Sequence, residues 1–186
     1  HYPLRRQRQM CIRDSANKAR LKAPHLLLLA ETDEGLQNLY RLNYYAATQG
    51  FYGKPRIDLK LLAKYSKGLI ATTTCVISNM ARYFQNKEID KMTGFFSDLA
   101  GIFGPDNLFI EMHPHDLDMQ LEYNQVLIEM FRKEYEEFKC ILANDVHYVM
   151  KEHSDTHSFL WRLNTDGRID EAGVDSLYMT SEDEIR

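Results

Sequence analysis

Short apolar segments alternate along the chain with longer stretches in which apolar residues recur every three or four positions. The short runs suit β-strands, and the periodic stretches suit helices that bury one face. We predict strands at 25–30, 69–74, 108–112 and 139–144. The run His25–Ala30 is apolar almost throughout, which predicts a strand buried on both faces.

Helix start and stop signals follow each predicted strand. Thr32 or Asp33 can cap a helix that ends at Gly50, and Asp58 can cap a short helix over 59–65. The first of these helices presents a stripe formed by Leu36, Leu39, Tyr40, Asn43 and Ala47. Further helices are predicted at 76–84, 87–102, 118–138 and 154–163.

Strands that alternate with helices predict an α/β protein with a parallel sheet, whose functional groups lie where strands end. A complete (β/α) barrel uses eight strands, so four strands predict a partial barrel or a small open sheet.

Composition excludes several functions for the 186 residues. Lys and Arg number 23 against 27 Asp and Glu, so the net charge of −4 offers no chain-wide basic field, and any DNA contact must be local. The longest apolar run is too short to cross a membrane. Cys11, Cys75 and Cys140 form neither a disulfide framework nor a paired zinc motif, so we expect an intracellular, cytoplasmic protein.

The first fifteen residues differ from the rest: they are rich in arginine and show no periodicity. They fit either a basic arm for nucleic acid or the translated remnant of a sequencing adaptor. We favour the remnant and expect residues 1–15 to be non-native or disordered.

Asp145 and His147 are the first candidates for chemistry. Two positions apart at the end of a predicted strand, they point to the same side and suit Zn²⁺ or Mn²⁺, although Asp145 capping a turn and His147 packing fit equally well. Cys75 ends another strand, where a thiolate ligand or a small buried side chain would fit. His113 and His115 follow a third strand, in a loop that faces substrate or is simply exposed. His157 shares a helix face with His153.

Four segments together carry a family resemblance: His25–Ala30, Gly50–Asp58 (GFYGKPRID), Tyr65–Ala71 leading to Cys75, and Ala143–Tyr148 (ANDVHY). In this order and spacing they resemble the C-terminal part of the PHP domain of bacterial or phage replicative DNA polymerase III alpha subunits. Residues 155–160 and 176–184 continue the resemblance.

The resemblance implies a (β/α) barrel whose strand ends hold zinc or manganese and hydrolyse phosphodiesters. The ligands present would be His25, Cys75, Asp145 and His147. Lys54 and Arg56 in the KPR loop would face phosphate or only shape the loop. His113, His115 and His157 would lie behind the ligands or face phosphate.

The same resemblance implies a partial PHP domain at 16–165, truncated at its N-terminus, and the start of a connection toward the polymerase palm at 166–186. The HxH motif and other early ligands, and the palm aspartates that bind Mg²⁺, would then lie outside this chain.

The full-length protein would be a DNA-directed DNA polymerase with a 3′–5′ exonuclease, and the isolated 186-residue chain would be inactive. Its partners would be DNA, the sliding clamp and a proofreading exonuclease. The alternative is a scaffold that supports the polymerase and docks that exonuclease. A free-standing PHP phosphatase fits less well, because the KPRID segment and the segment after Asp145-Val-His147 resemble the polymerase family.

Overall fold

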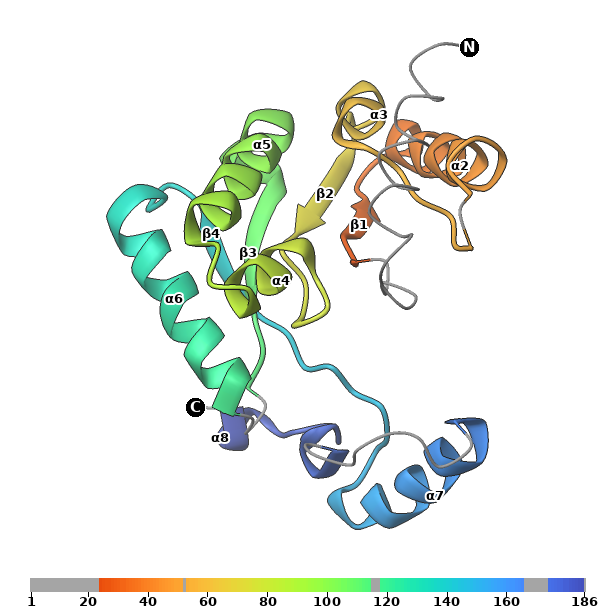
Figure 1. The fold of residues 1–186 in the computed structure, drawn as a ribbon, viewed down its shortest axis with the longest axis vertical. Helices are drawn as coiled ribbons and strands as arrows, with labels where there is room; N and C mark the ends of the chain where they lie inside the picture. The colour runs from red at the N-terminus through yellow and green to blue at the C-terminus, as the bar shows by residue number, and fades with distance from the viewer. Residues whose placement is uncertain (1–23, 52, 115–117, 166–173, 186) are drawn as a thin grey trace.

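The computed structural model describes residues 24–51, 53–114, 118–165 and 174–185; residues 1–15 and His115, discussed above, lie outside these ranges. Four strands form one sheet in the order β1 (Leu27–Ala30), β2 (Leu69–Thr72), β3 (Leu108–Met112) and β4 (Lys139–Leu142) (Figure 1). The predicted α/β class is confirmed. The sheet is only mostly parallel, because β1 pairs antiparallel with β2.

The direction of β1 corrects the all-parallel prediction, and hydrogen bonds to distant segments lie at both ends of the strand. The amide of Glu31, just after β1, donates to the carbonyl of Gly68, just before β2, over 2.9 Å. The end of β1 therefore meets the start of β2. As a result, the start of β1 lies beside the segment that follows β2, and the amide of His25 donates to the carbonyl of Ile77 over 3.2 Å.

The helices follow the predicted start signals. Thr32 Oγ1 accepts a hydrogen bond from the Gly35 amide over 3.1 Å, and Asp58 Oδ1 accepts from the Leu61 amide over 2.7 Å. The helices are α2 (Asp33–Thr48), α3 (Leu59–Lys64), α4 (Asn79–Gln85), α5 (Ile89–Asn107), α6 (Asp118–Glu134), α7 (Ser154–Thr165) and α8 (Glu182–Ile185), with 3₁₀ turns η1 (Lys151–His153) and η2 (Val174–Ser176).

The buried face of α2 differs from the predicted stripe. Tyr40 is 64% exposed, whereas Asn38 and Leu42 are buried. The cause is a close approach between backbones, because a Cβ on Gly35 would lie only 1.8 Å from the Gly68 carbonyl oxygen. Gly35 therefore lies on the face of α2 that meets the start of β2, and helical periodicity alone does not reveal this contact.

One face of the sheet carries the hydrophobic core. Side chains of β2 and β3 on this face pack against α5 and α6, which lie beside them in Figure 1. The opposite face is more open: Leu27 and Leu29 of β1 are 43% and 51% exposed. The prediction that β1 is buried on both faces is therefore wrong. The largest fully buried apolar side chains are Tyr123, Phe96, Leu62, Leu69, Met80, Met92, Leu99, Leu108, Ile110 and Leu127.

The segment after β4 leaves the sheet and leads to α7, which stands apart from it in Figure 1. The chain then returns: the amide of His147 donates to the carbonyl of Leu177 over 2.8 Å, and that of Met179 donates to the carbonyl of Tyr148 over 3.1 Å. Asn144 Nδ2 donates to Thr180 Oγ1 over 2.6 Å. These bonds hold 177–180 alongside 144–149. No helix in the described part of the chain is both long and apolar enough to span a bilayer.

Candidate metal site

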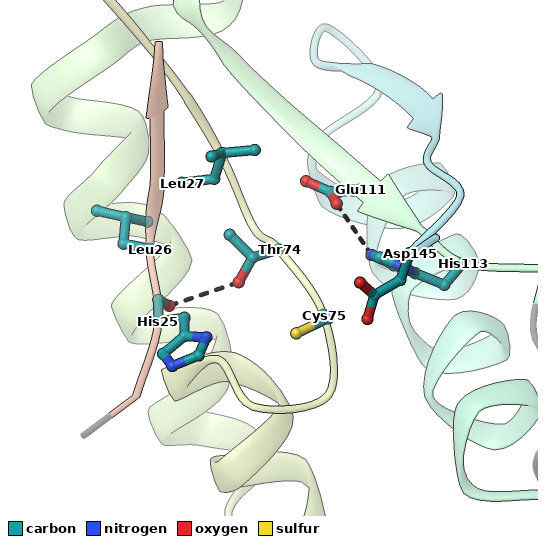
Figure 2. Close-up of a pocket in the computed structure, with 8 residues that line it drawn as sticks. All are labelled: His25, Leu26, Leu27, Thr74, Cys75, Glu111, His113 and Asp145. Carbon is teal, nitrogen blue, oxygen red and sulfur yellow. Dashed lines mark hydrogen bonds and ion pairs between the residues drawn. The ribbon is translucent and has the colours of Figure 1, made fainter. Parts of the chain in front are cut away.

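A cavity of about 310 Å³ opens where the antiparallel start of β1 meets the ends of β2, β3 and β4 (Figure 2). In Figure 2 the imidazole of His25 lies on one side, the carboxylate of Asp145 lies on the other, and Cys75 stands between them. The cavity is lined by His25, Leu26, Leu27, Thr74, Cys75, Glu111, His113 and Asp145.

The segment after β2 positions Cys75. Thr74 has a left-handed backbone conformation (φ 55°), which is uncommon for a β-branched residue and turns the chain sharply. The Thr74 hydroxyl donates to the carbonyl of His25 over 3.4 Å, and the amide of Ser78 donates to the carbonyl of Cys75 over 2.9 Å. Ser78 then caps α4, accepting from the Ala81 amide over 3.1 Å. The helix predicted from residue 76 therefore begins only at Asn79, after the turn that presents Cys75.

Glu111 and His113 form a buried pair that we did not predict. Glu111 is 6% exposed and His113 is 4% exposed, and His113 Nε2 lies 2.9 Å from Glu111 Oε1. The Thr72 hydroxyl donates to the other carboxylate oxygen, and Thr73 Oγ1 accepts from the Glu111 amide over 2.9 Å. One signal was present in the sequence: Glu111 interrupts an apolar strand, where a charged side chain requires a partner.

The carboxylates around the cavity disfavour a further negative charge on the Cys75 thiol. Burial raises the pKa of the Cys75 thiol, and the carboxylates of Asp145 and Glu111 raise it further, although a hydrogen bond from the Ile77 backbone opposes this. Burial also acts to raise the pKa of Glu111, but hydrogen bonds from His113 and Thr72 outweigh it, so the net pKa is lowered. The cavity thus holds a charged Glu111 carboxylate near a thiol whose pKa is raised first by burial and then by the neighbouring carboxylates.

Asp145 and His147 are adjacent, yet only Asp145 lines the cavity. His147 Nε2 lies 3.3 Å from Asp145 Oδ1. The His147 ring stacks on Trp161 with centroids 6.0 Å apart and planes at 5°, and His157 meets it edge-on at 5.5 Å. Burial lowers the pKa of His157, and the neighbouring His147 lowers it further. Residues of α7 therefore hold His147 beside Asp145, outside the cavity.

The other predicted site residues are dispersed. Lys54 and Arg56 do not line the cavity, and the Arg56 carbonyl instead packs closely against Gly50. Cys140 packs against the core, and burial raises the pKa of its thiol. Across the described ranges, no three His, Cys, Asp or Glu side chains are grouped so that they could hold one metal ion as they stand. The ligand roles therefore remain predictions.

Comparison with known proteins identifies the family. The family model described as PHP domain matches residues 7–115, more than half of the chain. The chain therefore belongs to the PHP domain family, as its resemblance implied.

The chain is also similar to DNA polymerase III alpha subunits from several bacteria. It is 36% identical over 159 residues to that of Aquifex aeolicus, covering 86% of this chain and 13% of the relative. It is 35% identical over 167 residues to that of Thermus aquaticus, covering 87% and 13%, and 32% identical over 168 residues to that of Saccharopolyspora erythraea, covering 87% and 14%. The chain thus spans about one seventh or less of the length of these curated relatives.

Proposed function

We propose that this chain is the PHP portion of a DNA polymerase III alpha subunit and that its cavity binds a divalent cation, Zn²⁺ or Mn²⁺. The observation that carries the proposal is the cavity itself, where imidazole, thiol and carboxylate side chains from four strand ends face one space. His25, Cys75 and Asp145 would hold the ion, and His147 would join them through its position beside Asp145.

The donor chemistry fits such an ion. Borderline divalent metals accept nitrogen, sulfur and carboxylate oxygen together. Burial, together with the carboxylates of Asp145 and Glu111, disfavours a thiolate at Cys75, and a bound dication would favour the thiolate instead. When bound, such an ion lowers the pKa of a coordinated water that can attack a phosphodiester. Glu111 contributes by fixing His113 at the cavity wall.

We infer that the whole protein is a DNA-directed DNA polymerase with a 3′–5′ exonuclease capacity in this domain. The relatives' names and the PHP family support this inference. Its polymerase domain would use Mg²⁺, and its partners would be DNA, the sliding clamp and a separate proofreading exonuclease in the cytoplasm.

A scaffold role is the second candidate, in which the domain supports the polymerase and docks the proofreading exonuclease. The exposed apolar side chains of Leu27 and Leu29 favour it, because strand residues of this kind become buried in larger assemblies.

Cobalt titration of the 186-residue chain tests the metal site. A thiolate ligand gives Co²⁺ an intense charge-transfer absorption, so we expect this band in the wild type and its loss in Cys75→Ser. Asp145→Asn should weaken binding at least about tenfold, as loss of a metal-site residue commonly does. Cys140→Ser is the matched control, since Cys140 packs against the core away from the cavity. Equal spectra for the Cys75 and Cys140 variants would refute the site.

A further inference from the structure

Aromatic and cationic side chains gather on α2 and α3, which lie in Figure 1 near the start of β2. The metal cavity lies beyond the other end of that strand. We call this group the tyrosine–cation surface, and it consists of Arg41, Tyr44, Tyr45, Lys64 and Tyr65.

The three tyrosine rings of this surface contact one another in sequence. Tyr45 stacks on Tyr65 with centroids 5.7 Å apart and planes at 19°. Tyr44 meets Tyr45 edge-on at 5.5 Å, and 62% of Tyr44 is exposed. Tyr40, one helical turn before Tyr44, is 64% exposed. Large aromatic side chains are costly to leave in water, so this degree of exposure on two successive turns indicates a contact surface.

Two cations lie close to the Tyr65 ring. The Arg41 guanidinium lies 5.9 Å and the Lys64 ammonium 5.1 Å from the centre of the Tyr65 ring. In the part of the chain that the structure describes, neither cation forms an ion pair with a carboxylate. In a protein with net charge −4, two such cations beside exposed rings form a local positive site.

Arg41 is held in place from beneath. Its Nη1 donates to Oδ1 of Asn38 over 2.8 Å. Asn38 is 4% exposed, and its Nδ2 donates to the carbonyl of Lys67 over 2.9 Å. The buried amide thus links the guanidinium to the backbone that precedes β2. A cation fixed in advance loses less conformational entropy when it binds an anion.

We propose that the tyrosine–cation surface binds single-stranded nucleic acid. Bases stack on exposed aromatic rings without regard to sequence, and adjacent cations bind the phosphates between them. The unstacked bases of a single strand can reach the Tyr44 ring, whereas those of a duplex cannot. This site is independent of the metal-site proposal, because it uses other residues at another place in the fold.

Fluorescence anisotropy with the full 186-residue chain tests the proposal. The probes are fluorescein-labelled dT12, rU12, a dT12 duplex and an abasic strand, measured in EDTA at several salt concentrations. We expect dT12 or rU12 to bind more tightly than the duplex and the abasic strand, and the tighter of the two identifies the natural strand.

Three variants separate stacking from charge. Tyr44→Ala should weaken binding about tenfold with an unchanged salt slope, since it removes one stacked base. Arg41→Gln should lower the slope of log affinity against log salt by about 0.7, the effect of one lost phosphate contact on a single strand. Lys151→Gln is the matched control: its ammonium lies 5.8 Å from the Tyr178 ring, outside this surface.

Absence of dT12 and rU12 binding would overturn the proposal. So would Tyr44→Ala and Arg41→Gln variants that bind like Lys151→Gln. An oligoglutamate peptide that binds more tightly than either strand would instead assign the surface to an acidic protein segment. Circular dichroism of each variant checks that the fold is retained. We expect Tyr44→Ala to fold normally, because the Tyr44 side chain is exposed.

Discussion

Gly35 is the position where a single added methyl group should damage this fold most clearly. A Cβ there would lie 1.8 Å from the carbonyl oxygen of Gly68 and 2.5 Å from its carbonyl carbon. Both obstacles are backbone atoms, so no side-chain rotation can relieve the clash. The same Gly68 carbonyl accepts the Glu31 amide that fixes the direction of β1.

The magnitude follows from the displacement required. An ordinary van der Waals contact starts near 3.4 Å, so α2 must retreat by roughly 1.5 Å from the start of β2. Overpacking of this kind costs about 1–3 kcal/mol or more, while replacing a helical glycine with alanine returns at most about 1 kcal/mol. Because only a shift of the backbone can relieve the clash, we expect Gly35→Ala to lower the free energy of unfolding by about 2 kcal/mol.

Urea and thermal unfolding measure the effect. At this chain length, 2 kcal/mol corresponds to a Tm lower by roughly 4–8 °C. Gly94→Ala and Gly101→Ala are the matched controls, since both glycines lie in α5 and a Cβ on either would meet nothing within 4 Å. These two variants should be more stable than the wild type by about 0.5–1 kcal/mol. A Gly35→Ala protein as stable as the controls would refute the close approach of α2 and β2.

Two further predictions concern the site. Glu111→Gln should destabilise the protein by about 1–3 kcal/mol at pH 7, because it removes a buried charge that accepts from His113 and Thr72. The lowered pKa of Glu111 means that its stabilisation is complete above the ordinary pKa of 4.5 and is lost as pH falls below it. Urea unfolding at pH 7 and pH 4 should therefore show the difference between variant and wild type shrink, and a difference independent of pH would contradict this. The 186-residue chain should show no exonuclease activity on a primer with a mismatched 3′ end, whereas the full-length protein should show chelator-sensitive cleavage that Asp145→Ala abolishes. Cleavage by the 186-residue chain that His147→Ala abolishes would contradict the expected inactivity of that chain. An inactive full-length protein would favour the scaffold role of the domain.

Local signals were sufficient for most of the secondary structure. Thr32 and Asp58 cap the helices predicted for them, because a cap depends on backbone amides only three residues away. Gly104 interrupts α5 with a φ of 70°, two residues after the end predicted for this helix. The residues of all four strands were also predicted, with ends displaced by two residues or fewer.

The tertiary structure alone decided how these elements combine. The antiparallel pairing of β1 with β2 joins distant segments, and it brings His25 to the cavity although His25 opens its strand. Thr72 donates a hydrogen bond to Glu111 although the two residues are 39 positions apart. The sequence around Glu111 therefore could not identify Thr72 as a partner of the buried carboxylate. The stacking of the His147 ring on Trp161 likewise could not be identified from the sequence around His147. Sequence periodicity indicates which segments form helices and strands, whereas contacts between distant segments decide which face of α2 is buried and which side chains share a site.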